Sequence, residues 1–299
     1  MEKLILIDGS GLIYRGFYAI PPFLKSPAGT LTNAVFGFTT ILLSIMATQK
    51  PDYLAVAFDR KGPTFRHKAF EAYKATRVKA PQELYDQIPL VREVVETFGV
   101  PGFEAEGYEA DDILATVVKQ MKPNKNLEVL IATGDFDIFQ IAGERVSILY
   151  PAKGFKQAEI MAQSDIEKKY GISPAQIPDY KGIAGDSSDN IPGVKGIGDK
   201  GAVSLLQQYG SLEKIYENLE ALSPGMRKKL EDSRQQAFMS KELATLVADV
   251  PVNFDLEACR AKSFDAASVR KLFESLGFKS LVKRLDEMYE KEEPQRSLF

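Results

Sequence analysis

Three short apolar runs, each followed by an acid within three residues, most constrain how this chain can fold. They occupy residues 4–7, 53–58 and 127–132, and segments with helical periodicity separate them. Strands that are buried on both faces of a parallel sheet have this pattern, because helices cover both faces. The sequence therefore predicts an α/β fold with a mostly parallel central sheet and helices on both faces.

Carboxylates follow all three runs. Asp8 comes after the first run and Asp59 after the second, while Asp135 and Asp137 follow the third in Thr133-Gly134-Asp135-Phe136-Asp137. Ligands of open α/β sheets bind at the carboxyl ends of the strands, so these acids should meet at one edge. Turn chemistry alone can place one acid after a strand, but it is a poor explanation for the whole set.

A predicted helix adds acids within Gly107-Tyr108-Glu109-Ala110-Asp111-Asp112. Asp111 lies three and seven residues before Leu114 and Val118 of the apolar stripe, so its side chain should point inward. An unpaired buried carboxylate costs on the order of several kcal/mol, and therefore needs a cation. The helix macrodipole alone can explain Glu109 and Asp112, but not an inward Asp111.

Another acidic segment, 185–190, precedes a glycine-rich stretch, and it completes a set of nine candidate metal ligands. With one His and one Cys in the chain, the donors are carboxylate oxygens, which suit Mg²⁺ or Mn²⁺ and not structural zinc. Two metals about 4 Å apart would let the acids coexist and would activate water for attack on a phosphodiester. This predicts a nuclease whose ligands are Asp8, Asp59, Glu109, Asp111, Asp112, Asp135, Asp137, Asp186 and Asp189.

Basic residues concentrate in one segment, although the formal charge of the whole chain is −3. Residues 60–79 contain Arg and Lys with a single acid, and Phe65, Phe70 and Tyr73 lie between them. Cations with interleaved aromatic rings suit phosphate contact and base stacking. The alternative is a solvated helix face.

Glycines between Gly193 and Gly201 precede an apolar segment, 202–206, that should be helical. Glycine lets the backbone approach a ligand closely, and the free N–H groups at a helix start can bind phosphate. We interpret this as a helix-hairpin-helix that binds DNA backbone without regard to sequence. Tight turns alone would also use such glycines.

Residues 26–49 carry no charge over a length that could cross a membrane. Pro27 and Gly29 interrupt the first part, and the remainder has helical periodicity, which favours a buried helix. The N-terminus lacks the pattern of a secretory signal, and the one cysteine cannot pair within the chain. We expect a cytoplasmic protein with no membrane segment.

Taken together, these motifs resemble the 5′ nuclease domain of bacterial DNA polymerase I, within the flap endonuclease family, over about residues 1–290. The residues that carry the resemblance are Asp8, Phe58-Asp59, Phe65-Arg66, Tyr73-Lys74 with Arg77, and the acidic segments 107–112, 133–137 and 185–193.

The resemblance implies a structure-specific 5′-3′ exonuclease and flap endonuclease that acts on DNA with a 5′ flap or 5′ end and on RNA-primed DNA. It implies a core like that of PIN and resolvase domains, two divalent metals, and a helical arch at about residues 60–82. Arg15, Lys74 and Arg77 would approach the scissile phosphate, and a K⁺ ion would bind the 193–198 loop. The DNA contacts would come from Phe65, Arg66, Tyr73, Gly193, Lys195, Gly196, Gly198 and Lys200.

Two features depart from the family pattern. Phe136 stands where relatives often carry a basic or polar residue, which removes a phosphate contact. No polymerase follows within the sequence, so we expect a monomeric, stand-alone nuclease that cooperates with a separate DNA polymerase and ligase. The expected parts are a nuclease core (1–178), a helical region with the hairpin (179–289) and a flexible tail (290–299).

The last five residues, Gln-Arg-Ser-Leu-Phe, end a charged spacer on two large apolar side chains. The pattern resembles short peptides that dock on the replication sliding clamp, and burial of each apolar side chain would contribute roughly 1.5–3 kcal/mol. Gln295, Leu298 and Phe299 are therefore candidate clamp contacts. The alternative is that these side chains fold back on the core.

Two other classes of function fit part of this sequence. A non-catalytic DNA-binding module would use the basic segment and the hairpin but has no use for nine acids. A PIN-type ribonuclease would share the acidic sheet edge but would lack the hairpin.

Overall fold

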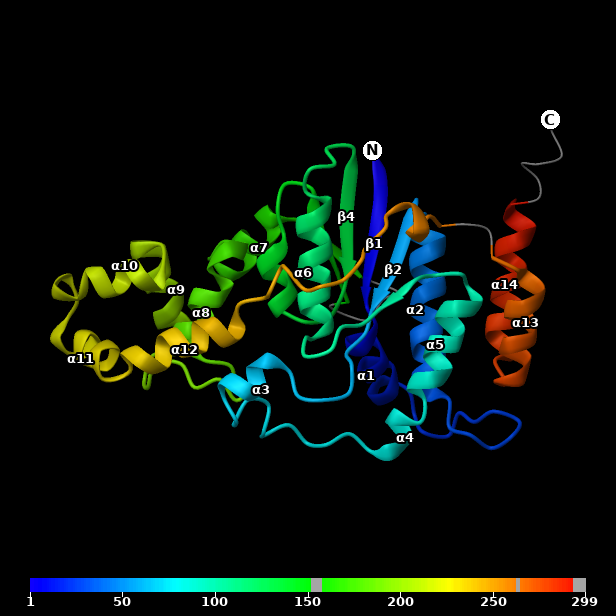
Figure 1. Ribbon diagram of the computed structural model, residues 1–299, viewed down its shortest axis with the longest axis horizontal. Helices are drawn as coiled ribbons and strands as arrows, with labels where there is room; N and C mark the ends of the chain where they lie inside the picture. The colour runs from blue at the N-terminus through cyan, green and yellow to red at the C-terminus, as the bar shows by residue number, and fades with distance from the viewer. Residues whose placement is uncertain (152–157, 262–263, 293–299) are drawn as a thin grey trace.

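A six-stranded sheet lies at the centre of the computed structural model, which describes residues 1–151, 158–261 and 264–292, with side chains up to residue 288 (Figure 1). The strand order is β3-β2-β1-β4-β5-β6, and all neighbours are parallel except β5 and β6. The strands are β1 (Glu2–Asp8), β2 (Tyr53–Ala57), β3 (Gly102–Phe103), β4 (Leu127–Ala132), β5 (Val146–Tyr150) and β6 (Glu159–Met161). The predicted α/β fold with a mostly parallel sheet is confirmed.

The central strand β1 is buried on both faces, as its unbroken apolar run predicts. Leu4 and Leu6 contribute to one hydrophobic cluster, while Ile5 and Ile7 contribute to the other. Successive side chains of a strand point to opposite faces, so each face of the sheet needs its own cover of helices. The sheet is therefore the middle layer of three.

The first covering layer consists of helices near both ends of the sequence. The helices are α1 (Gly9–Ala19), α2 (Asn33–Gln49), α5 (Ile88–Thr97), α13 (Ala266–Ser275) and α14 (Lys279–Glu292). The predicted buried helix within 26–49 is confirmed as α2. The last two helices were grouped with the hairpin region, but they pack on the sheet side of the molecule, because Phe273 and Leu285 belong to the same buried cluster as Ile5. The predicted tail also begins later, because α14 continues to Glu292.

The second layer begins with α6 (Ala110–Met121) and continues into a helical end of the molecule. That end comprises α7 (Gln163–Tyr170), α8 (Ile177–Ala184), α9 (Asp199–Tyr209), α10 (Leu212–Glu217), α11 (Pro224–Asp232) and α12 (Arg234–Ala244). In Figure 1 these helices extend away from the sheet on the side opposite α13 and α14. No helix among the described residues is both long enough and apolar enough to span a membrane.

The predicted helical arch is mostly not helical. Between β2 and α5 the chain contains the five-residue helix α3 (Phe65–Ala69) and the four-residue helix α4 (Gln82–Tyr85), with turns and extended chain between them. Tyr73 within this segment is buried, and it packs with Ile191 and Leu243 from the helical end. Tertiary packing on those neighbours thus replaces a continuous helix, and we call residues 64–77 the basic segment below.

Candidate active site

Asp8 is the buried centre of the acidic edge. It ends β1 and caps α1, because its Oδ1 accepts the backbone N–H of Gly11 at 2.8 Å and its Oδ2 accepts the Thr133 hydroxyl at 2.9 Å. Burial, followed by the charges of Asp59 and Asp135, raises the pKa of Asp8 to about 7. Two strands thus hold this carboxylate where ionisation is unfavourable unless a cation is present.

Asp59, Asp111 and Asp135 gather around Asp8, as the sequence predicts. The pKa of Asp111 is raised well above its ordinary value, first by burial and then by the charges of Asp135, Asp8 and Asp59. Asp59 is held in place at the start of α6, where its Oδ1 accepts the N–H of Ala110 at 2.8 Å. The carboxyl ends of β1, β2 and β4 and the first turn of α6 therefore deliver one acidic group.

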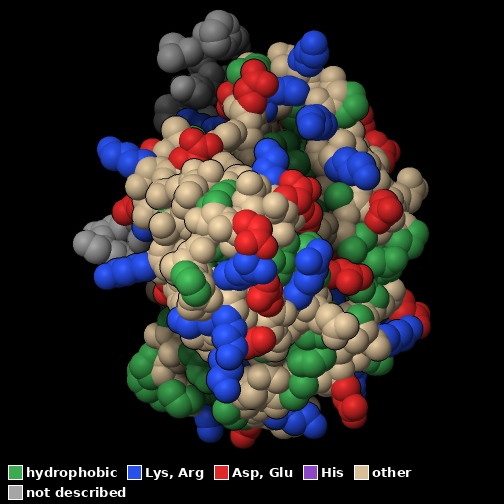
Figure 2. Space-filling view, turned by 90° about the vertical axis from the view of Figure 1, so that its left-hand side faces the viewer, with side chains coloured by type: hydrophobic (Ala, Val, Ile, Leu, Met, Phe, Trp, Pro, Cys, Tyr) green, Lys and Arg blue, Asp and Glu red, His purple; other side chains and the backbone are tan. Residues whose placement is uncertain are grey.

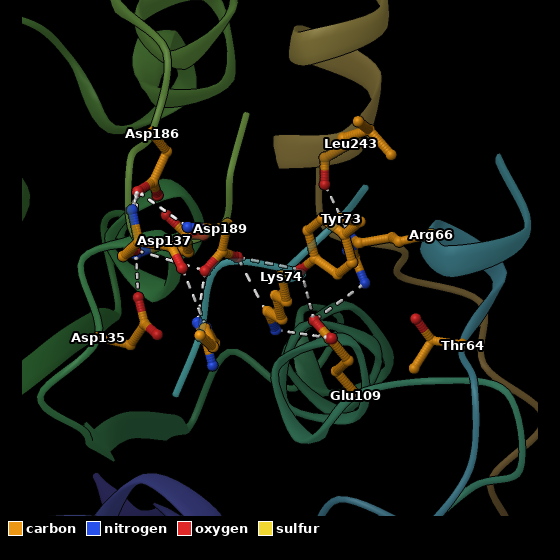
Figure 3. A network of polar contacts seen from close by, with 12 residues as sticks. Thr64, Arg66, Tyr73, Lys74, Glu109, Asp135, Asp137, Asp186, Asp189 and Leu243 are labelled. Atoms are coloured by element: carbon orange, nitrogen blue, oxygen red, sulfur yellow. Dashed lines mark hydrogen bonds and ion pairs between the residues drawn. The ribbon is translucent and has the colours of Figure 1, made fainter. Parts of the chain in front are cut away.

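A second acidic group lies beside the first. Asp137, Asp186 and Asp189 each have one carboxylate oxygen within 4.8 Å of the others, a spacing that could hold a metal ion. The charge of Asp135 helps to raise the pKa of Asp137 to about 7, after the larger effect of burial. Figure 3 shows Asp135 next to this group. Asp135 therefore connects the two groups.

Lys181 is a site residue that the sequence analysis missed. It is buried on α8 and forms ion pairs with both Asp137 and Asp186. The available signal was a lysine in the last turn of a helix that leads directly into an acidic loop. Its charge partly compensates the second acidic group.

Tyr73 and Lys74 connect the basic segment to the acids (Figure 3), and so does Arg77. The Lys74 ammonium lies 2.7 Å from Glu109 Oε1 and 3.8 Å from Asp189 Oδ2, and the Tyr73 hydroxyl donates to both acids. Arg77 pairs with Asp189, and the backbone N–H of Lys74 donates to the Asp189 carbonyl at 2.9 Å. Lys74 has a φ of 56°, which side chains adopt only when surrounding contacts require it. These contacts fix the predicted catalytic cations beside the acids.

Arg66 and Asp112 form a buried ion pair that the sequence analysis did not predict. Two guanidinium nitrogens of Arg66 lie 2.8 Å from the two carboxylate oxygens of Asp112, and both side chains are buried. Arg66 Nε also donates to the Leu243 carbonyl at 2.8 Å, while the N–H of Val247 donates to Asp112. In this structure the two side chains neutralise each other, and the roles of Asp112 as a metal ligand and of Arg66 as a DNA contact stay predictions.

Two further residues that were predicted to contact DNA, Tyr73 and Phe65, pack against other side chains of the protein. Tyr73 is buried, and among the described residues its hydroxyl partners are Glu109 and Asp189, so its ring is not exposed in this structure. Phe65 is half-buried, with its ring 5.9 Å from that of Tyr108. Aromatic residues of the basic segment thus pack the segment against the rest of the protein.

Arg15 and Phe136 flank Asp135. One Arg15 nitrogen donates to the Pro151 carbonyl at 2.7 Å, and another lies close to Gly134. Phe136 turns to aromatic neighbours, with its ring centre 4.8 Å from that of Tyr170. Arg15 is therefore held by the Pro151 carbonyl close to Gly134, and Phe136 contributes packing where a basic residue would contribute charge.

The predicted helix-hairpin-helix consists of α8, a loop and α9. Gly193 is buried in this loop, and a Cβ on it would lie 2.3 Å from the backbone nitrogen of Gly185. Gly193 is thus required for backbone packing inside the protein, and its contact with DNA stays a prediction. Asp186 and Ile191 exchange two backbone hydrogen bonds, of 2.7 and 2.8 Å, which close the loop that carries the second acidic group.

The outer part of the hairpin is exposed. Lys195, Gly196, Gly198 and Lys200 all face solvent, at the end of the molecule where Figure 2 shows Lys and Arg side chains interspersed with acids. Helix α9 begins at Asp199, so its first N–H groups have no partner within the helix. These residues suit contact with a phosphate backbone. The tail residues Gln295, Leu298 and Phe299 lie outside the described residues.

Comparison with known families finds two matching models. Residues 3–171 match the N-terminal resolvase-like domain of 5′-3′ exonucleases, and residues 172–267 match their C-terminal SAM fold. Together they cover the sheet with its acidic edge and the helical end with its hairpin.

The chain is also similar to bacterial DNA polymerases I and to solved nuclease structures. It is 41% identical to the enzyme of Bacillus subtilis and 43% identical to that of Caldicellulosiruptor bescii, over 99% and 95% of its length. The chain spans about a third of the length of these polymerases. T5 5′-exonuclease with bound zinc has the same fold, with a TM-score of 0.69 at 19% identity over 96% of this chain and 97% of that one. The catalytic core of Rad2 in complex with DNA gives a TM-score of 0.60 at 17% identity, over 92% and 88% of the two chains. The chain belongs to the 5′-3′ exonuclease family.

Proposed function

We propose that this chain is a metal-dependent, structure-specific 5′ nuclease that hydrolyses phosphodiesters in DNA with a 5′ flap or 5′ end, including RNA-primed DNA. The observation that carries the proposal is the meeting of two acidic groups at Asp135, beside the basic residues Lys74 and Arg77. Such a concentration of carboxylates destabilises a protein unless cations offset it. The family membership supports the same chemistry.

The acids fit two Mg²⁺ or Mn²⁺ ions. All donors are carboxylate oxygens, which these ions prefer. Burial and neighbouring carboxylates raise the pKa values of Asp8, Asp111 and Asp137, so a bound cation would favour their ionised forms. Asp8, Asp111 and Asp135, with Asp59 and Glu109 beside them, would hold one ion, and Asp137, Asp186 and Asp189 would hold the other. Bound there, the ions would supply an activated water and charge stabilisation at the leaving oxygen.

The residues of the chain itself would bind and orient the phosphate. Lys74 and Arg77 neutralise Glu109 and Asp189 in the structure, so metal binding to these acids would leave both cations available to a phosphate oxygen. Arg15, which lies near Gly134, would be a further phosphate contact. The exposed hairpin would hold the duplex backbone and so position the cleavage point.

The nuclease would act together with other proteins of DNA replication and repair. We infer a cytoplasmic monomer that works with a DNA polymerase and a ligase, and that docks on the sliding clamp through Gln295, Leu298 and Phe299. Such a tether would replace diffusive encounter by a high effective concentration. Removal of residues 295–299 should abolish clamp binding while cleavage of short flap substrates stays unchanged. Retained clamp binding would refute docking through the tail. A lower melting temperature would show that the tail belongs to the fold.

The central test compares Asp135→Asn with Glu144→Gln, a change of an exposed acid away from the site. With Mg²⁺ and a 5′-flap DNA, we expect Asp135→Asn to reduce the single-turnover rate by about 10³-fold or more, while Glu144→Gln changes little. Affinity for the flap DNA should survive in both variants. Full turnover by Asp135→Asn would refute the proposal. Cleavage of plain single-stranded RNA in place of flap DNA would instead indicate a PIN-type ribonuclease, and binding without any Mg²⁺-dependent cleavage would indicate a non-catalytic module.

A further inference from the structure

The basic segment and the loop that carries Asp189 are joined by two hydrogen bonds that run in opposite directions. The backbone N–H of Lys74 donates to the Asp189 carbonyl at 2.9 Å. In return, the side-chain amide of Asn190 donates to the carbonyl of Ala72 at 2.6 Å. Two neighbouring residues of the loop thus hold two residues of the basic segment, one of which is the proposed catalytic lysine.

The Ala72 carbonyl begins a tight turn around Lys74. The same carbonyl accepts the backbone N–H of Ala75 at 3.1 Å, so Lys74 is an inner residue of this turn. The backbone of Asn190 is fixed as well, because it lies within the loop that paired backbone hydrogen bonds close. The amide therefore reaches the turn from a rigid support.

Both Lys74 and Asn190 have a left-handed backbone, with φ of 56° and 57°. Asn adopts this conformation more readily than most residues, whereas Lys does so only where its surroundings require it. Among the described residues, the third non-glycine residue with a positive φ is Lys50, which ends helix α2, where this conformation is common. Lys74 ends no helix, so its conformation depends on its hydrogen bonds to the loop.

Ion pairs also hold Lys74, but they depend on the charge of the acids. The ammonium lies 2.7 Å from Glu109 Oε1 and 3.8 Å from Asp189 Oδ2. Metal binding by these two acids would weaken both ion pairs, because the carboxylates would then also neutralise the metal. The hydrogen bond between Asn190 and Ala72 contains no charged group and would persist. It would therefore keep Lys74 in place when its ion pairs are weakened.

We propose that Asn190 is a positioning residue for Lys74. Through the Ala72 carbonyl, its amide fixes the turn that presents the Lys74 ammonium to the scissile phosphate. Asn190 itself contacts no reacting atom, and its effect passes through the lysine. This inference rests on the proposed function, because it concerns how the proposed phosphate contact is held.

The test is a double-mutant cycle on the single-turnover cleavage rate of a 5′-flap DNA in Mg²⁺. Asn190→Gly removes the amide but keeps a left-handed backbone accessible. It should slow cleavage by about tenfold, because a small displacement of a group that acts on the phosphate is costly to the rate. The double variant with Lys74→Ala should match Lys74→Ala alone within about twofold, since without the ammonium the amide has nothing to position.

Two matched variants support the cycle. Ser187→Gly adds the same backbone freedom at an exposed position of the same loop, and it should keep the wild-type rate within about twofold. Asn190→Asp retains the size of the side chain, but its carboxylate cannot donate to a carbonyl. It should be slow, and equally non-additive with Lys74→Ala.

Two measurements without cleavage distinguish positioning from a general structural role. Isothermal titration with Mn²⁺ should give Asn190→Gly the wild-type affinity within about twofold, because Asp186 and Asp189 remain as ligands. The Kd for flap DNA in EDTA, measured by fluorescence anisotropy, should change by less than about threefold, because Asn190 makes no phosphate contact. A structural collapse of the loop would instead weaken metal binding.

Wild-type cleavage by Asn190→Gly would overturn the inference, as would a double variant whose loss is the product of the two single losses. Weaker Mn²⁺ binding by Asn190→Gly would assign Asn190 to the structure of the metal-binding loop and would also overturn it. In each of these cases Lys74→Ala is still slow, and the proposed function stands. Wild-type cleavage by Lys74→Ala would refute the proposed role of Lys74, and the inference would fall with it.

Discussion

The acidic edge and the hairpin differ in how far their charged side chains are buried and paired with one another. At the edge, carboxylates and cations are crowded and largely buried, and they depend on one another, as the Arg66–Asp112 pair and the Lys74 contacts show. On the hairpin, Lys195 and Lys200 are exposed, and the first backbone N–H groups of α9 have no partner within the helix. The comparison teaches that changes at the edge should alter stability and chemistry together, whereas changes on the hairpin should alter affinity alone.

The largest expected effect is on stability, at Arg66. Arg66→Met leaves Asp112 as a buried charge without its ion-pair partner, which should lower the free energy of unfolding by about 3–5 kcal/mol. Urea unfolding measures the change. Lys68→Met, at an exposed position of the same short helix, should stay within about 0.5 kcal/mol. A loss below about 1 kcal/mol at Arg66 would show that the edge tolerates unpaired charge.

Lys74 should have the next largest effect, on chemistry. Lys74→Ala should lower the single-turnover cleavage rate by about 10²-fold, as loss of a stabilising charge at a reacting phosphate does. Lys79 is exposed and serves as the comparison. Lys79→Ala should mainly weaken binding and lower the log–log salt slope by about one unit. Equal, small effects of both changes would make the basic segment a solvated face without catalytic function.

A smaller effect with a defined pH dependence is expected at Asp8. Its pKa is about 7 in the folded chain against an ordinary 3.8, so the folded state holds the proton more tightly. Without metal, the contribution of Asp8 to stability therefore falls as pH rises from about 4 to 7 and stays low above that range. Asp8→Asn removes this loss and should be more stable than the wild type by roughly 1–3 kcal/mol at pH 8 in EDTA. The difference should vanish near pH 4; a wild type that gains stability between pH 4 and 7 relative to the variant would reverse the sign.

The smallest effect is expected on the hairpin. Lys200→Ala should weaken duplex binding about two- to fivefold and reduce the salt slope by about one unit, because it removes one exposed phosphate contact. Its free energy of unfolding should remain within about 0.5 kcal/mol of the wild type. Anisotropy titrations at several salt concentrations, with urea unfolding alongside, measure both quantities. A marked loss of stability would erase the contrast between the two regions.

The acidic edge could be predicted because topology fixes it. Strands β1, β2 and β4 were visible as apolar runs, and parallel strands bring their carboxyl ends to the same edge. Strands β3, β5 and β6 were missed, since β5 is only partly buried and β3 and β6 have two and three residues, which leaves weak periodicity. The sequence pattern is therefore most informative where burial is complete.

The neighbours Asp111 and Asp112 show where periodicity fails. Helical phase placed Asp111 inward, yet Asp112 is the more deeply buried of the two, because the partner that neutralises it, Arg66, comes from a distant segment. No local pattern reports such a partner. The same limit applies to Lys181, whose acidic partners meet it only through the folded loop, and to the arch, where packing of Tyr73 outweighs helix propensity.

The contact between Gly185 and Gly193 has a consequence for how this protein can change over evolutionary time. The two backbones touch, and the chain between them is closed by paired hydrogen bonds, so the segment that carries Asp186 and Asp189 has a fixed length. An insertion or deletion there would displace both carboxylates together, even if every side chain were retained. We therefore expect length variation among homologues to accumulate in the exposed connections and to be excluded from this loop.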